Sequence, residues 1–208
     1  IRHRLSDESS AMPSFTNTRR TPLLLACLFL VASIVPVARA ATGLPAAMPE
    51  RAQFKKVGGG QLSWLGFDIY DASLWTVSGR YEGFGPGQKV ALSLWYQRSF
   101  TVDELLGITE KAWTRLGRDP AWRASRLDSL RALWSDVSPG QNMTTVVEAG
   151  GATRFYDEQR LVGRIDDPEF GPAFLAIWLD PRSIVRDLRV QLLGDSDESA
   201  STAKSARN

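Results

Sequence analysis

Two arginine and tyrosine pairs are the residues of this chain whose types and spacing best fit ligand chemistry. Tyr96 and Arg98 share the apolar parity of residues 89–98, whose alternation predicts a strand with one buried face. Arg154 and Tyr156 repeat the pairing on another predicted strand. A guanidinium beside a phenol can hold an acidic head group through charge-assisted hydrogen bonds. Alternatively, Arg98 turns to solvent at the end of its strand or bonds to the backbone of the next helix.

Aromatic side chains form a second candidate set, because the chain contains seven tryptophans. Such residues fit either a hydrophobic core or the apolar lining of a small-molecule pocket, and Trp113 is a candidate for the lining. Tyr70 is placed either to donate to a ligand carbonyl or to pack across strands. The acidic residues within 166–169 fit helix capping better than a metal site, and the glycines at 58–60 fit a turn better than a phosphate loop. We expect neither a metal nor a cofactor.

The N-terminal segment has the features of a cleavable signal peptide. Arginines at 19–20 precede an apolar run over 23–35, and an Ala-x-Ala site ends at Ala40, which predicts cleavage before Ala41. Met12 is the expected start. The apolar run is shorter than a stable membrane-spanning helix requires. We therefore expect a periplasmic protein with no stable membrane anchor after processing.

Removal of this leader would change the chemistry available to the chain. It would take away Cys27 and His3, the sequence's single cysteine and single histidine. Thiol nucleophiles, soft metal sites and histidine relays need those residue types, so any catalysis would depend on carboxylates, lysine, arginine, tyrosine or backbone groups. Of the 25 basic and 23 acidic residues, five and two lie in residues 1–40, which leaves 20 and 21, a net charge of −1. That balance argues against a general nucleic-acid binder.

Composition and periodicity divide the chain into a leader (1–40), a linker (41–52), one folded domain (53–193) and a disordered tail (194–208). Strands are predicted over 53–57, 62–77, 89–98, 142–149, 153–156 and 161–165. Helices are predicted after a capping box at Thr101 and Glu104, after Asp119 and Pro120, after Asp167 and Pro168, and over 183–193. Strands grouped at both ends, with helices between and after them, favour an α+β fold in which helices cover one side of a large antiparallel sheet.

Several segments together resemble the bacterial chalcone isomerase-like family. They are GGGQLSWLGFDIYDASLW (58–75), ALSLWYQRSFTVDEL (91–105), RFYDEQRLVGRIDDPEFGPAFLAIWLD (154–180) and LRVQLLG (188–194). The resemblance implies an exported protein with an open-faced β-sandwich, in which a helical layer encloses a ligand cleft. The plant enzymes of this superfamily carry an essential arginine just after the glycine-rich turn, where this chain has Gln61 and Leu62. Their threonine on the next strand has its rough counterpart near Ile69.

Three functions remain open at this stage. The first is non-catalytic binding of a hydrophobic or acidic amphipathic small molecule, because the resemblance extends to fatty-acid binders that hold a carboxylate with an arginine and a tyrosine. The second is an isomerase or intramolecular lyase acting on a chalcone-like or enolisable substrate, with Arg98 and Tyr96 polarising a carbonyl. The third is an envelope protein-interaction module, whose cleft is closed by side chains and whose exposed aromatic residues bind a partner. The oligomeric state is not predicted.

Overall fold

The structure is a computed structural model that describes residues 43–85 and 88–194. Its elements are η1 (Arg51–Gln53), β1 (Lys55–Trp64), β2 (Phe67–Thr76), β3 (Val90–Tyr96), α1 (Val102–Arg115), α2 (Pro120–Leu133), β4 (Asn142–Val147), β5 (Thr153–Tyr156), β6 (Leu161–Ile165), α3 (Phe170–Leu179) and α4 (Arg186–Leu193). The predicted leader, the cleavage site between Ala40 and Ala41, and the tail after residue 194 lie outside the described residues.

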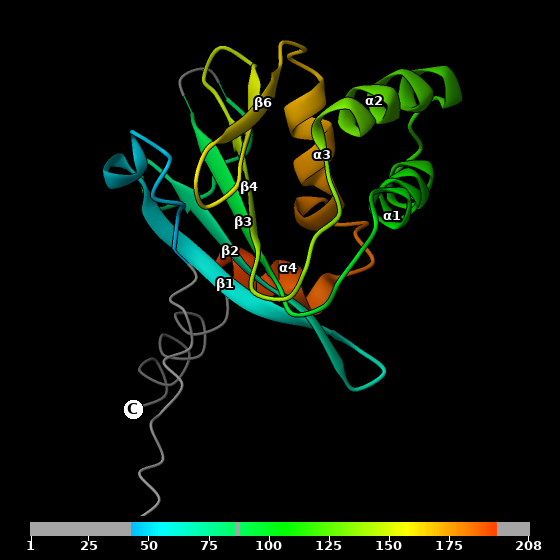
Figure 1. Cartoon of the computed structure of the whole chain (residues 1–208). Helices are drawn as coiled ribbons and strands as arrows, with labels where there is room; N and C mark the ends of the chain where they lie inside the picture. The colour runs from blue at the N-terminus through cyan, green and yellow to red at the C-terminus, as the bar shows by residue number, and fades with distance from the viewer. Residues whose placement is uncertain (1–42, 86–87, 195–208) are drawn as a thin grey trace, which may run out of the picture. The chain divides into compact units, whose positions relative to one another are not determined.

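The six strands form one sheet in chain order, and every neighbouring pair is antiparallel. Helices α1, α2 and α3 lie on one side of this sheet, and α4 lies against β1 (Figure 1). The predicted α+β fold, an antiparallel sheet with a helical layer, is confirmed.

Strand β3 shows how the sequence creates the core. Val90, Leu92, Leu94 and Tyr96 alternate along it and are all buried in the main cluster beneath the helices. Alternate residues of a strand point to opposite faces, so this one parity faces the helical layer. The same hydrophobic cluster contains the apolar face of α3, so packing within it holds the helical layer on the sheet.

Two of the predicted helix starts are confirmed, and a third lies elsewhere. Thr101 and Glu104 form a reciprocal capping box on α1. Asp119 accepts the N–H of Trp122 at 3.0 Å at the start of α2. Helix α3, however, begins at Phe170, because Asp167 shapes the preceding turn and its Oδ2 accepts from Arg126 Nη2 at 2.6 Å. The acidic residues before α3 therefore take part in a turn and, through Asp167, in an ion pair with Arg126.

The sequence suggested that the glycines at 58–60 form a turn between two strands, but the structure places them within one strand. Strand β1 runs through them with an irregular register beside Gly58, and the turn into β2 lies at Leu65 and Gly66, which have φ of 51° and 80°. A Cβ on Gly58 would lie 2.6 Å from the carbonyl oxygen of Leu192. The glycine is there because α4 approaches the strand at backbone distance.

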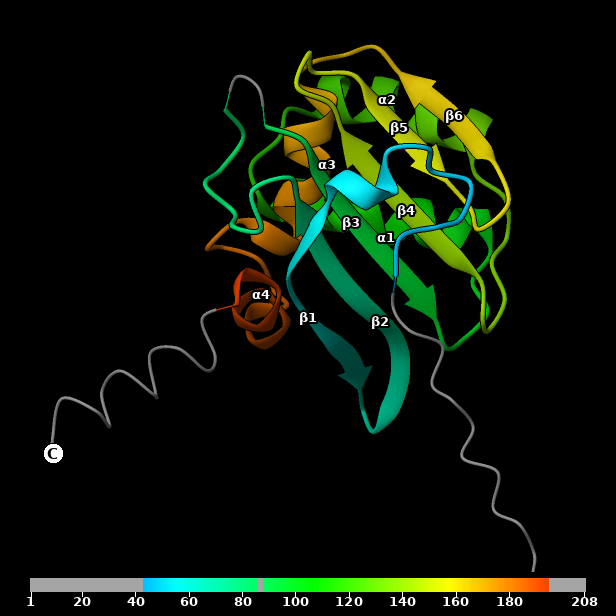
Figure 2. The same ribbon diagram turned by 90° about the vertical axis from the view of Figure 1, so that its left-hand side faces the viewer.

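The opposite face of the sheet is covered in part by the segment that precedes β1. Figure 2 shows residues 43–54 crossing in front of the sheet, with α1 and α2 behind it. Met48 and Phe54 are buried there against Ala91, Val146 and Tyr156. Most of this segment belongs to the interval 41–52 that its composition marked as a linker. Its described part is packed, because Met48 and Phe54 are buried and Leu44 and Ala47 pack against the same cluster.

Candidate functional site

A cavity of about 600 Å³ lies between the sheet and the helical layer. Strands β1 to β4 form its floor, and α1, α3 and the segment before α4 form its walls. Small-molecule pockets usually have volumes of about 300–1,000 Å³ and a mostly apolar lining. This cavity has both properties, because most of the side chains that line it are aliphatic or aromatic.

The interior of the cavity contains two tyrosines from adjacent strands. Tyr70 and Tyr96 pair in the register of β2 and β3, with ring centroids 6.1 Å apart in an edge-to-face arrangement. The hydroxyl of Tyr70 accepts a hydrogen bond of 2.8 Å from Nε1 of Trp178. Burial raises the pKa of both phenols far above the ordinary value, and the Trp178 hydrogen bond only partly offsets this for Tyr70. Both tyrosines are therefore neutral in the folded protein.

The mouth of the cavity is more polar than its interior. Trp64, Ile108 and Ile184 line the cavity and are also largely exposed, which places them at the rim. Lys111 and Arg115 of α1 line the same region and are exposed as well. They are the two charged residues among those that line the cavity.

The structure separates Tyr96 from Arg98. Tyr96 points into the cavity, but Arg98 is exposed beyond the end of β3, and its guanidinium lies 5.1 Å from the ring centroid of Phe67. Of the two positions foreseen for Arg98, the structure has the one toward solvent. Tyr70, another candidate, lies beside Tyr96 as described above.

The second predicted pair, Arg154 and Tyr156, lies together on the opposite face of the sheet. Nη1 of Arg154 donates to the Tyr156 hydroxyl at 2.7 Å, and the guanidinium also binds the carboxylates of Glu148 and Glu50. Lys89 approaches the same Glu148 at 3.1 Å. The arginine is thus saturated by the protein's own acids, and this pair does not face the apolar cavity.

Trp113 belongs to the core. It is fully buried, its Nε1 donates to the carbonyl oxygen of Ala173 at 2.9 Å, and it packs edge-to-face on Phe170 and Phe174. It does not line the cavity.

Sequence reasoning missed Lys111 and Arg115, although the sequence carries a signal for them. Ile108, Lys111, Ala112 and Arg115 follow the i, i+3, i+4, i+7 spacing of one helix face, and this face is distinct from the one that α1 buries. This second stripe mixes apolar and basic residues, and all four of its members line the cavity.

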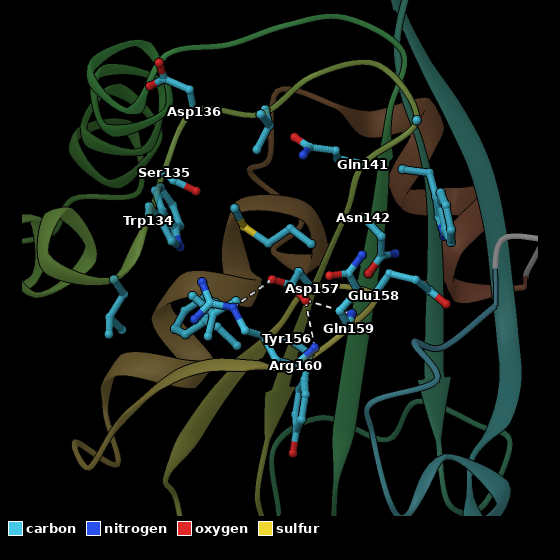
Figure 3. A pocket seen from close by; sticks show the side chains of 17 residues that line it. Trp134, Ser135, Asp136, Gln141, Asn142, Tyr156, Asp157, Glu158, Gln159 and Arg160 are labelled. Atoms are coloured by element: carbon cyan, nitrogen blue, oxygen red, sulfur yellow. Dashed lines mark hydrogen bonds and ion pairs between the residues drawn. The ribbon is translucent and has the colours of Figure 1, made fainter.

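A second pocket of about 390 Å³ opens at one end of the sheet. Figure 3 shows its labelled side chains on three segments: 134–136 after α2, 141–142 at the start of β4, and the 156–160 turn before β6. Asp157 closes this turn by accepting the N–H groups of Gln159 and Arg160, both at 2.8 Å. Trp134 and Met143 line both this pocket and the apolar cavity, so the two adjoin each other.

Within 43–85 and 88–194, no group of three or more histidine, cysteine, aspartate or glutamate side chains is arranged to hold a metal ion. No helix in this part of the chain is long and apolar enough to cross a membrane. The absence of a cofactor stays a prediction.

Comparisons with known proteins agree with this architecture. A family model described as chalcone isomerase-like matches residues 53–194. A search among curated proteins finds no match. Among solved structures, a fatty-acid binding protein of Arabidopsis thaliana has a similar fold, with a TM-score of 0.56 and 14% identity over 73% of this chain and 91% of that chain. Because the family model covers most of the sequence, the chain belongs to the chalcone isomerase-like family.

Proposed function

We propose that the protein binds a hydrophobic or amphipathic small molecule in the apolar cavity and does not transform it. The observation that carries this proposal is the combination of a 600 Å³ volume with an apolar lining that reaches solvent at an exposed rim. Burying the apolar part of a ligand there contributes about 25 cal/mol for each Å² removed from water. The similarity to a structure described as a fatty-acid binding protein supports the same conclusion.

The isomerase alternative is less well supported by this geometry. No carboxylate and no histidine lies among the described residues that line the cavity, and its single lysine, Lys111, is exposed at the rim. Arg98, which was to polarise a carbonyl beside Tyr96, lies outside it. The interaction-module alternative assumed a cleft filled by side chains, and an open cavity beside Tyr96 argues against that version.

The site of action belongs to the proposal as well. The leader pattern that ends at Ala40 supports export to the periplasm, where a carrier for apolar molecules would act on ligands that are poorly soluble in water. N-terminal sequencing of the protein recovered from the periplasm tests this part. We expect the first residue to be Ala41, and an uncleaved chain retained in the cytoplasm would contradict it.

A cavity-blocking substitution tests the binding function. Ala112 lies on α1 and lines the cavity, so Ala112→Trp would fill space that a ligand needs. Thr114→Trp is a matched control, because Thr114 is exposed on the same helix and does not line the cavity. Circular dichroism and thermal unfolding would show that both variants fold.

Native mass spectrometry after gentle purification would then compare the bound molecules. We expect an apolar ligand on the wild type and on Thr114→Trp, and none on Ala112→Trp. A wild-type protein that carries no ligand and binds neither fatty acids nor flavonoids in calorimetry would refute the proposal. Equal loading of all three proteins would show that the ligand binds elsewhere.

A further inference from the structure

We propose that the ligand is an anionic amphiphile, and that Lys111 and Arg115 bind its head group at the mouth while its apolar tail lies inside. This inference rests on the proposed function and specifies the ligand class and its orientation. It differs from the clamp expected from the sequence, in which an arginine and a tyrosine hold the head group on the sheet.

The interior of the cavity cannot hold an anion favourably. Among the described residues, no charged side chain other than Lys111 and Arg115 lines it, and the tyrosines within it are neutral because burial raises their pKa. The Tyr70 hydroxyl, which accepts from Trp178, keeps its O–H donor, but a neutral donor does not supply the counter-ion that a buried carboxylate needs. A carboxylate placed there would lose its hydration without gaining a counter-ion, which is strongly unfavourable. An acidic ligand must therefore leave its head group at the rim.

The two bases at the rim are arranged to receive that group. Lys111 and Arg115 are four residues apart on α1, so their side chains leave the same face of the helix, with Cβ atoms about 5–6 Å apart. Neither has a hydrogen-bond or ion-pair partner within the described part of the chain. Arg126 and Arg154, by contrast, are each paired with a carboxylate. The rim is thus a place where basic side chains remain available to a ligand.

The apolar rim residues complete an amphipathic entrance. Ile108 lies one turn before Lys111 on the same face of α1, and Trp64, the last residue of β1, also lines the cavity. Both are more than half exposed. The first carbons of a tail can contact these side chains while its charged end remains within reach of the two bases and of water, as long amphipathic groups generally do at apolar surfaces.

Calorimetry with matched ligands tests the head-group assignment. Dodecanoate, dodecanol and methyl dodecanoate share a chain length and differ in the charge of the head group. The variant is Lys111→Gln/Arg115→Gln. The control is Lys55→Gln/Lys56→Gln, which removes the same charge from exposed positions on β1 that do not line the cavity. Circular dichroism checks that both variants fold.

We expect the wild type to bind dodecanoate more tightly than the two uncharged ligands. The Lys111/Arg115 variant should lose about tenfold in dodecanoate affinity, as exposed charge pairs allow, and change less than twofold for dodecanol. Added salt should weaken only the dodecanoate complex of the wild type. The Lys55/Lys56 control should bind all three ligands as the wild type does.

Three results would overturn the head-group assignment and leave the proposed function standing. They are equal wild-type affinity for the acid and the alcohol, an unchanged dodecanoate affinity in the Lys111/Arg115 variant, or an equal loss in the Lys55/Lys56 control. Failure of every ligand to bind the wild type would instead contradict the proposed function itself.

Discussion

Gly58→Ala is the substitution that most directly tests how α4 is seated on β1. A Cβ at this position would lie 2.6 Å from the Leu192 carbonyl oxygen and closer still to that of Gln191. Both are backbone atoms of α4, so no side-chain rotation relieves the clash. To bring the Leu192 oxygen from 2.6 Å to an ordinary contact of 3.4 Å, the helix must retreat by 0.8 Å, and the closer Gln191 oxygen requires a larger movement.

The expected loss in the free energy of unfolding follows from the side chains that α4 buries. Overpacking of a well-packed contact typically costs about 1–3 kcal/mol. If α4 detached instead, Leu188 and Leu192, which are both buried, would lose about 1.5–3 kcal/mol each. We therefore expect the free energy of unfolding to fall by about 3 kcal/mol. With a typical urea dependence of about 1–3 kcal/mol per molar, the midpoint falls by about 1–3 M.

Urea unfolding followed by tryptophan fluorescence measures this change, and two other glycines calibrate it. Gly107→Ala adds a Cβ in open space within α1, so it should leave stability unchanged or raise it by up to about 1 kcal/mol. Gly60→Ala meets the side chain of Gln191, and adding Gln191→Ala should recover much of its loss. A Gly58→Ala protein as stable as Gly107→Ala would refute the claim that α4 is seated on bare backbone.

Three further predictions concern single interactions. Tyr70→Phe leaves the buried Nε1 of Trp178 without its acceptor and should lower the free energy of unfolding by about 1–3 kcal/mol, whereas wild-type stability in urea would contradict that bond. Burial disfavours ionisation of Glu148, but Arg154 and Lys89 outweigh it and hold the pKa of its carboxyl below the ordinary value. This ion-pair stabilisation is therefore present above the unfolded-state pKa and is lost as the pH falls through the folded-state pKa. The difference in free energy of unfolding between wild type and Arg154→Met, measured by denaturant titration, should therefore shrink in acid. A difference that widens in acid would be inconsistent with this sign. Arg98→Ala should change dodecanoate affinity less than twofold in calorimetry, because Arg98 lies on Phe67 outside the cavity, and a tenfold loss would restore the clamp with Tyr96.

Local patterns in the sequence predicted most elements of the fold. The alternation around Leu92 and Leu94 identified β3 and its buried face, and the capping box at Thr101 identified the start of α1. These signals depend on neighbours within a few residues. The glycines at 58–60 misled because a glycine required by a distant helix has the same sequence pattern as a glycine required by a turn.

The candidate site was harder to predict than the fold. Strand parity identified Tyr96, and Tyr70 was identified as a possible donor to a ligand; both line the cavity. Arg98 has the same parity but lies past the end of β3, where the alternation no longer fixes its direction. Lys111 could be placed in the cavity lining only from the structure, because the residue spacing along a helix face does not show whether that face borders a core or a cavity.

The contact between α4 and β1 also bears on the order in which the protein folds. It joins the beginning and the end of the domain, since β1 starts at Lys55 and α4 ends at Leu193. Contacts between such distant parts of a chain form slowly, because a long loop must close before they stabilise anything. Ile184 and Val185, directly before α4, belong to the cavity wall. The wall of the cavity is therefore completed only when α4 docks, and until then its apolar lining is open to water and to other unfolded chains.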